Sequence, residues 1–282
     1  MHDLLDSLTT PPSGRATPVW FDSLAYCQEK LLSGGPVPWA SPGELTAFTS
    51  KAHGMFRSDA LLVDLAELYA WRVATDAALR TSMAARSRPG YALRTLLADD
   101  GARAVAVDAL SAAAGASGST PVVLSAPAPA RWLSISAEQA GQPVDVPDSD
   151  RADTAGMYMA DLLRVFAAGP VDGLLLDEGS TPAADLLHPD AYRPVLNVAD
   201  HYGWLVLLCT AAAPAWPHGA VAGVAGWIGS PPRDRPAGTW GVCTGDEFWG
   251  GTDPTGDPDL VLAVVPAHAD PERVMGRVRT LG

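Results

Sequence analysis

The chain has 282 residues, 48% of them hydrophobic, which is enough for one large α/β domain with a buried core or for two small domains. The formal net charge is −13, and only two of the 19 basic residues are lysines, so the average surface would repel a phosphate backbone. This composition argues against nucleic acid as a partner. Cys27, Cys209 and Cys243 are odd in number and widely spaced, so we expect reduced thiols and no disulfide framework.

No apolar run in the sequence reaches the roughly 18 residues that a membrane-spanning helix needs. The first residues, MHDLLDSL, lack the basic and then apolar order of a secretory signal peptide. We therefore expect a cytoplasmic protein that has no membrane partner and binds a small-molecule substrate.

Eight short apolar runs bounded by turn residues predict β-strands. In chain order they are Pro18–Asp22, Ala60–Asp64, Pro121–Ser125, Asp172–Asp177, Trp204–Cys209, Ala220–Ile228, Thr239–Cys243 and Leu260–Val265. Runs compatible with helices lie between several of them, at Pro42–Phe56, Tyr91–Ala114, Thr154–Ala168 and Pro189–Tyr202. The alternation of strand and helix predicts a parallel sheet, and eight such units predict an α/β fold of the (β/α)8 TIM-barrel type, one domain over residues 1–282.

Three connections are predicted to be loops. Ser230–Gly238 and Thr244–Asp259 are rich in Pro, Gly and Asp, so we expect a thinner layer of helices after the sixth and seventh strands. The acidic segment Ala140–Asp153 is likewise expected to be an exposed loop.

Acidic residues end three of the predicted strands: Asp22 the first, Asp64 the second, and Asp177 with Glu178 the fourth. In a barrel the carboxyl ends of the strands meet at one rim, where catalytic groups lie, so these acids are candidates for a shared site. A carboxyl group against apolar walls has a raised pKa and can act as a general acid. Asp177 and Glu178 are adjacent on a strand, so only one can face the cavity. Asp22 and Asp64 could instead cap the helices that follow them.

Four further residues are candidates for substrate contact or proton transfer. Arg131 follows the third strand, and its guanidinium could bind a carboxylate through two parallel hydrogen bonds or simply be solvated. His268 follows the last strand and could protonate a carbanion, or be an ordinary loop residue. Trp20 and Trp227 lie near strand ends and could line a pocket for a flat ligand or fill the core.

Six segments, in this order along the chain, are similar to those of a known superfamily. They are TPVWFDSLA from residue 17, SPGELTAFTSKAHGMFRSDALLVDLAEL from 41, TPVVLSAPAPARWL from 120, ADLLRVFAAGPVDGLLLDEGS from 160, HPDAYRPVLNVADHYGWLVLL from 188 and LVLAVVPAHADPERVMGRVRTL from 260. The set resembles the uroporphyrinogen decarboxylase and cobalamin-independent methionine synthase superfamily, and the decarboxylase branch in particular. The resemblance implies a TIM barrel, a ligand-facing acid at Asp64, a ligand-contacting histidine at His268 and pairing of barrels into a homodimer.

The sequence departs from true uroporphyrinogen decarboxylases at two places. WFDSLAYCQEK, from residue 20, has no arginine where the family has an arginine-bearing segment that holds substrate carboxylates. The family's long excursion after the third strand is shortened here to Ser134–Asp153. We therefore expect a smaller carboxylated or aromatic substrate than a porphyrin.

The expected function is that of a lyase without a cofactor, in particular a decarboxylase, with the substrate at the carboxyl-terminal mouth of the barrel. Asp64 would orient the substrate, Arg131 would bind a carboxylate and His268 would transfer the proton. A catalytically silent barrel that binds a ligand or a partner protein is an alternative, since one fold hosts many functions.

A second alternative follows from the superfamily's thiol methyltransferases, which hold zinc with a His-x-Cys at a strand end and a later cysteine. Cys209 in WLVLLCT occupies the corresponding place, but Leu207 stands two residues before it. Cys243 could supply a second sulfur, with Glu178 or His268 completing the set, and zinc would activate a substrate thiol. Both cysteines could instead be small buried residues at strand ends.

Overall fold

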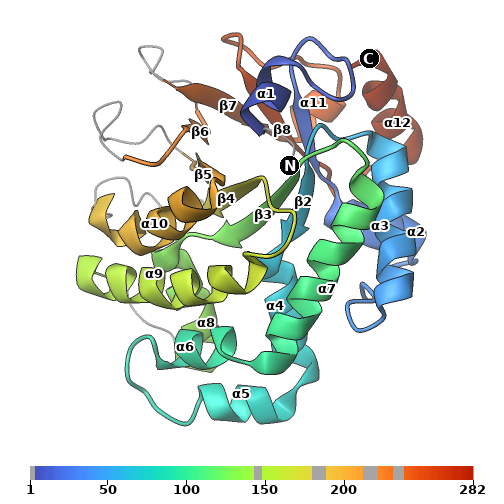
Figure 1. Ribbon diagram of the computed structural model, residues 1–282. Helices are drawn as coiled ribbons and strands as arrows, with labels where there is room; N and C mark the ends of the chain where they lie inside the picture. Colours follow the sequence, from blue (N-terminus) through green and yellow to red (C-terminus); the bar gives the residue numbers. More distant parts are fainter. Residues whose placement is uncertain (1–3, 143–147, 180–188, 212–221, 231–237, 282) are drawn as a thin grey trace.

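The computed structural model describes residues 4–142, 148–179, 189–211, 222–230 and 238–281. At its centre one sheet of eight parallel strands curves into a nearly closed barrel, with helices packed around it (Figure 1). The strands are β1 Val19–Asp22, β2 Leu61–Asp64, β3 Val122–Pro127, β4 Gly173–Asp177, β5 Leu205–Cys209, β6 Gly226–Ile228, β7 Thr239–Thr244 and β8 Leu260–Val264. The predicted (β/α)8 fold is confirmed, and the strands lie close to their predicted bounds, except that the predicted start of β6, Ala220, lies outside the described residues.

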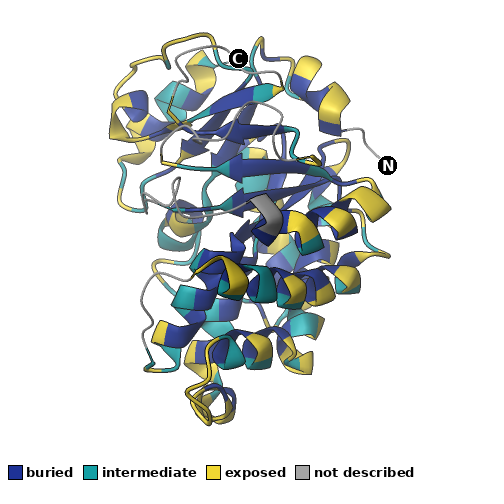
Figure 2. Cartoon of the chain, turned by 90° about the vertical axis from the view of Figure 1, so that its left-hand side faces the viewer, coloured by how far each residue is buried: buried dark blue, intermediate teal, exposed yellow. Residues whose placement is uncertain are grey.

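The helices that surround the barrel are, in chain order, α1 Leu4–Thr9, α2 Leu24–Leu31, α3 Pro42–Phe56, α4 Leu65–Thr75, α5 Ala77–Met83, α6 Tyr91–Leu97, α7 Asp100–Ser117, α8 Pro129–Gln139, α9 Ser149–Leu163, α10 Arg193–Tyr202, α11 Asp246–Trp249 and α12 Pro271–Thr280. Two short 3₁₀ helices, η1 Arg164–Phe166 and η3 Pro189–Tyr192, adjoin α9 and α10. Exposed residues gather on the outer surfaces of the helices, whereas the strands are largely buried (Figure 2). Among the described helices none combines the length and the hydropathy of a membrane span.

Helix caps explain where the predicted helices differ from the observed ones. The range Tyr91–Ala114 is divided between α6 and α7, because Asp99 accepts the N–H of Ala102 at 2.7 Å and starts a new helix. The loop prediction for Ala140–Asp153 is wrong from Ser149 onward, where α9 begins behind the N-cap Asp148. The thin helical layer after β7 is confirmed, since that connection holds only the four-residue α11. Most of the connection after β6 lies outside the described residues.

Alternate residues of the strands point inward and fill the barrel. Trp20, Leu175, Leu207 and Leu262 belong to one buried apolar cluster inside it, which Leu4 and Leu8 of α1 also join. Gly173 begins β4, and a Cβ at that position would clash with Leu4, so α1 closes the amino-terminal end of the barrel. The opposite, carboxyl-terminal end is therefore the one left open for a site.

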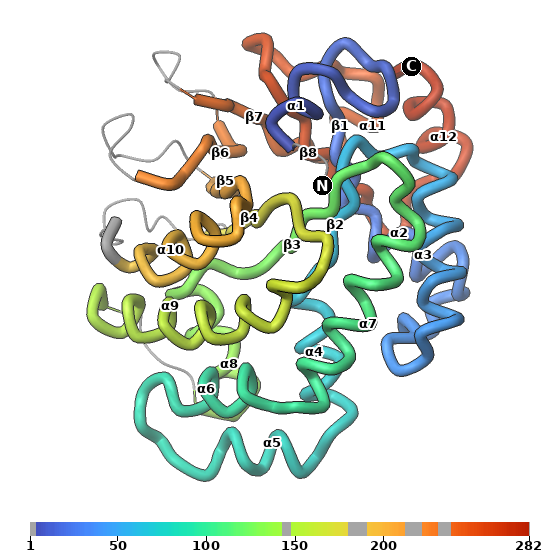
Figure 3. The backbone as a smooth tube through the Cα atoms, viewed as in Figure 1, coloured from blue at the N-terminus to red at the C-terminus, as the bar shows by residue number. Residues whose placement is uncertain are grey.

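The barrel is closed by different means on the two sides of β1. β1 and β8 come from opposite ends of the chain and lie side by side (Figure 3), joined by a parallel ladder that pairs Val19 with Val261. Within the described residues no backbone ladder joins β1 to β2. We call this junction the seam.

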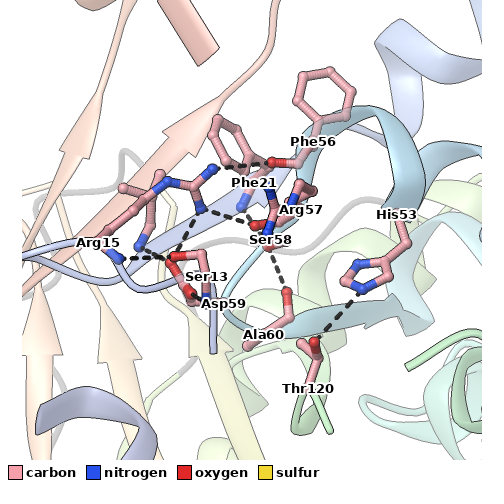
Figure 4. Close-up of polar contacts among 11 residues, drawn as sticks. Ser13, Arg15, Phe21, His53, Phe56, Arg57, Ser58, Asp59, Ala60 and Thr120 are labelled. Carbon is pink, nitrogen blue, oxygen red and sulfur yellow. Dashed lines mark hydrogen bonds and ion pairs between the residues drawn. The ribbon is translucent and has the colours of Figure 1, made fainter. Parts of the chain in front are cut away.

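Side chains from the turn just before β2 close the amino-terminal half of the seam. The N–H of Val19 donates to Asp59 Oδ2 at 2.9 Å, and the N–H of Phe21 donates to Ser58 Oγ at 3.0 Å (Figure 4). Asp59 also forms an ion pair with Arg15 at 3.2 Å, in which the two side chains are 0% and 2% exposed. We call these three residues, Arg15, Ser58 and Asp59, the clasp. The clasp supplies the acceptors that a neighbouring strand would otherwise provide for β1.

Candidate functional site

A cavity of about 280 Å³ opens at the carboxyl-terminal mouth of the barrel. Its floor is apolar and includes Leu62, Leu175 and Leu262. Its polar lining comes from strand ends and the turns that follow, namely Asp22, Ser125, Asp177, Cys209, Thr210 and Cys243. The strand register thus brings Asp22 of β1 and Asp177 of β4 to one rim, the region where TIM-barrel enzymes place their catalytic groups.

Asp64 stands beside Asp22 at this rim, and it both caps a helix and faces a cavity. Its Oδ1 accepts the N–H of Glu67 at 3.0 Å, which starts α4. Asp22 and Asp64 also line a second cavity together. The capping role that was open for Asp22 falls to Ser23, which is the N-cap of α2 but makes no side-chain capping bond.

Burial raises the pKa of both of these acids. Burial raises the pKa of Asp64 to about 7, and the charges of Asp22 and Glu67 add to this against the opposing effect of the Glu67 N–H. The pKa of Asp22 is also raised, first by burial and then by the charges of Asp177 and Glu67. Near neutral pH Asp64 can therefore supply a proton as well as accept one.

Asp177 is fixed by partners on both of its carboxylate oxygens. Its Oδ1 accepts the N–H of Gly179 at 2.8 Å, and its Oδ2 pairs with Nη1 of Arg131. Gly179 has φ +69°, and a Cβ there would lie 2.9 Å from the guanidinium carbon, so only glycine fits under Arg131. In the described part of the chain Nε and Nη2 of Arg131 have no hydrogen-bond acceptor, and the side chain is 35% exposed. Both nitrogen atoms are hydrogen-bond donors of the kind that bind an anion.

Glu178 faces away from the mouth, as the alternation of a strand requires, so Asp177 is the cavity-facing member of the adjacent pair. Glu178 is 8% exposed, and its Oε1 has no hydrogen-bond partner among the described residues. Burial, followed by the charge of Asp177, raises the pKa of Glu178 to about 7, while Arg131 opposes the rise.

Cys209 of β5, the register neighbour of Asp177, and Cys243 of β7 also lie at the mouth, and their thiols share a hydrogen bond. That bond lowers the pKa of Cys243 and raises the pKa of Cys209, so Cys209 is the donor. Cys243 is exposed and Cys209 is half-buried, which does not agree with the view of both as buried apolar residues. Among the described residues no group of three or more His, Cys, Asp or Glu side chains lies together as metal ligands. Neither Glu178 nor His268 completes a zinc set there, and these residues alone do not fit a four-coordinate zinc ion.

Of the eight predicted substrate or catalytic residues, only Asp22 and Asp177 line the mouth cavity itself. Asp64 lines the second cavity, Arg131 pairs with Asp177, and Glu178 faces away. The other three, His268, Trp20 and Trp227, lie apart from the mouth. The side chain of His268 is 86% exposed, and its Nδ1 lies 3.9 Å from Glu29 of α2. Trp20 is fully buried inside the barrel, and Trp227 is buried in the outer core between the strands and helices. The expectation that these tryptophans line a pocket is corrected, because their positions on the strands direct both rings into packed layers.

Sequence reasoning overlooked two polar residues of the mouth, Ser125 and Thr210. Ser125 ends the apolar run of the third predicted strand, and this position resembles that of the acids on other strands. Thr210 follows Cys209 directly after β5. A search for any polar residue at a predicted strand end would have found both.

Comparison of the sequence with known proteins gives no match, neither to a protein-family model nor to a curated protein.

Proposed function

We propose that the protein is an enzyme of the lyase class that removes carbon dioxide from a small carboxylated substrate bound at the barrel mouth. The observation that carries this proposal is the grouping of three features at the rim. Asp22 lies above the apolar floor of the mouth cavity, Asp64 lies beside Asp22 in the adjoining cavity, and Arg131 is paired with the mouth residue Asp177. The (β/α)8 fold supports an enzyme in general, because many enzymes share it and place their chemistry at this end.

In this proposal Arg131 binds a carboxylate of the substrate through Nε and Nη2, while Asp177 holds the guanidinium in position. The apolar floor favours loss of charge from the scissile carboxylate, since a charged group is poorly solvated there. When the carbon–carbon bond breaks, carbon dioxide leaves and the electron pair stays on the substrate carbon. Asp64 donates its proton to that carbon, and its pKa near 7 suits a proton donor at neutral pH. Burial also raises the pKa of Asp22, which favours its protonated form and limits repulsion at the rim.

In this proposal Asp64, and not His268 as the sequence suggested, is the proton donor, because the imidazole of His268 lies at the surface beside Glu29. We keep the uroporphyrinogen decarboxylase-like superfamily as the proposed family and a homodimer as the proposed assembly. Both rest on the resemblance of the sequence segments.

The test is a screen of small mono- and dicarboxylic acids for release of carbon dioxide by the wild-type protein and by the Asp64→Asn and Arg131→Gln variants. We expect turnover in the wild type, a loss of kcat of roughly 10²-fold or more in Asp64→Asn, and mainly a raised KM in Arg131→Gln. Glu178→Gln removes an acid that faces away from the mouth and serves as the control. Tight binding of an acid without carbon dioxide release would favour the silent ligand-binding barrel.

The contact between Cys209 and Cys243 favours one second candidate, a zinc-dependent methyltransferase that acts on a thiol. The described residues supply two sulfurs and no third ligand, so we derive no step through zinc. Elemental analysis of protein purified without chelator tests this candidate. Near-stoichiometric zinc that is lost in Cys209→Ser would place the methyltransferase first.

A further inference from the structure

A second cavity, of about 100 Å³, adjoins the mouth at the seam between β1 and β2. It shares Asp22, Leu62 and Ser125 with the mouth cavity, so the two spaces meet at the rim. Its remaining lining comes from β1 and β2, from helices α2, α3 and α7, and from the segments that join these elements. We call it the seam cavity.

The barrel wall is open at this place because the clasp reaches only part of the way along the strands. Ser58 and Asp59 serve the N–H groups of Phe21 and Val19. Beyond Phe21, toward the mouth, no hydrogen bond or ion pair joins β1 to β2 in the described chain. The barrel wall is therefore open here between the mouth, where the proposed reaction takes place, and the helices outside the barrel.

The two ends of the seam cavity differ in chemistry. Asp22 and Asp64 lie at the rim end. The walls beyond them are largely apolar and include Trp39, Leu45, Phe48, Phe56, Ala109 and Ala113. Polar residues also occur there. Ser58 belongs to the clasp, and His53 Nε2 lies 3.5 Å from Thr120 Oγ1, while its buried Nδ1 has no hydrogen-bond partner among the described residues.

We propose that the seam cavity is a side pocket of the active site that takes an apolar group of the substrate, no larger than a single ring, while the carboxylate stays in the mouth. This inference rests on the proposed function and narrows its substrate class to carboxylic acids with one branched aliphatic or aromatic arm. Small-molecule sites with these features are mostly apolar, and a few polar groups fix the ligand's orientation.

The size of the pocket sets the limit on the arm. An apolar cavity of about 150 Å³ in another protein is known to bind benzene. The seam cavity is smaller, about 100 Å³, but it is open toward the mouth, so a ring can enter with its edge still in the mouth cavity. A fused two-ring arm would have to displace helix α3 or α7.

The test compares two phenyl-bearing acids, 3-phenylpropionate and 4-phenylbutyrate, with propionate and butyrate by isothermal titration calorimetry at pH 6. Thr49→Leu on α3 and Ala113→Leu on α7 each fill part of the pocket. Thr46→Leu is the matched control, since it makes the same exchange on α3 at a half-buried position that does not line the cavity.

We expect at least one phenyl acid to bind the wild type more tightly than its short partner. Each filling variant should weaken that binding by roughly 10- to 100-fold, with little change for the short acids and little effect of Thr46→Leu. Equal binding of long and short acids, no binding of either phenyl acid, or an equal loss in Thr46→Leu would overturn the inference.

Asp64→Asn separates this inference from the proposed reaction. The variant keeps the cap of α4 and the pocket, so it should bind the phenyl acids with the wild-type preference even though it lacks the proton donor. If the preference fails while carbon dioxide release still depends on Asp64, the side pocket is wrong and the reaction stands. If the preference holds without any turnover, the reaction is wrong and the side pocket stands.

Discussion

Removal of the Asp59 carboxylate should destabilise the barrel more than the loss of any surface ion pair. Asp59 is fully buried and accepts three hydrogen bonds, from the N–H groups of Ser13 and Val19 at 2.9 Å and from Arg15 Nη1 at 3.2 Å. In Asp59→Ala the guanidinium of Arg15, itself 2% exposed, keeps its charge without a counter-charge. Breaking a buried pair in this way costs about 3–5 kcal/mol.

The two orphaned N–H groups add to that cost. A buried donor without an acceptor costs about 1–3 kcal/mol, and part of this can be recovered by local rearrangement. We therefore expect Asp59→Ala to lose at least about 4 kcal/mol of the free energy of unfolding, against about 5–15 kcal/mol for a typical whole domain. Urea denaturation followed by circular dichroism measures this, provided the slope of the transition is unchanged.

Asp76→Ala is the matched comparison, because Asp76 likewise accepts a backbone N–H and pairs with an arginine but is 26% exposed. It should cost clearly less, because solvent screens the exposed pair. A double variant, Arg15→Met with Asp59→Ala, should recover part of the loss, since the unpaired charge is gone. The reasoning would be refuted if Asp59→Ala cost no more than Asp76→Ala.

Three further predictions concern the mouth. Burial raises the pKa of Asp64 to about 7 in the folded protein, well above the ordinary value of 3.8, so the native state holds the proton more tightly and stability falls as pH rises from about 4 to 7. The urea midpoint of Asp64→Asn should therefore rise relative to that of the wild type between pH 5 and pH 8, and a constant difference would contradict this. Gly179→Ala should displace Arg131 and lower the free energy of unfolding by about 1–2 kcal/mol, because φ is +69° and the added Cβ meets the guanidinium. Calorimetry should also show weaker binding of carboxylates to this variant. An unchanged affinity would argue against Arg131 as the anion site. Iodoacetamide should modify Cys243 before the other cysteines, because Cys243 is exposed. In Cys209→Ala the modification of Cys243 should be slower, since the thiol that stabilises its thiolate is gone. Peptide mass spectrometry measures both rates, and equal rates for Cys243 in the wild type and the variant would count against the shared hydrogen bond.

The sequence predicted the strands well because their signal is local. A run such as VVLS from residue 122 is apolar and ends at turn residues, and no distant contact is needed to recognise it. The start of α9 was missed for the opposite reason, since the cap at Asp148 lies within an acidic stretch that resembles a loop. The rim positions of Asp22, Asp64 and Asp177 followed from the parallel sheet, whose carboxyl ends must meet.

The remaining parts of the site depend on geometry that no local pattern contains. The direction of the His268 side chain is set by the path of the turn between β8 and α12. Trp20 is buried because it occupies an inward-facing position on its strand. The thiol contact of Cys209 and Cys243 joins strands that are separated by β6. The seam cavity could not be expected, because a regular barrel has a ladder between every pair of neighbouring strands.

The missing ladder also gives this sheet two edges, which a fully closed barrel does not have. Exposed edge strands invite pairing with another chain, and proteins protect them with short strands, charges or covering segments. Here β1 and β2 are four residues long, and the clasp occupies the N–H groups of Val19 and Phe21 with the side chains of Asp59 and Ser58. The buried arginine that holds Asp59 in place therefore also guards the protein against edge-to-edge aggregation, and variants of the clasp should be judged by their solubility as well as by their stability.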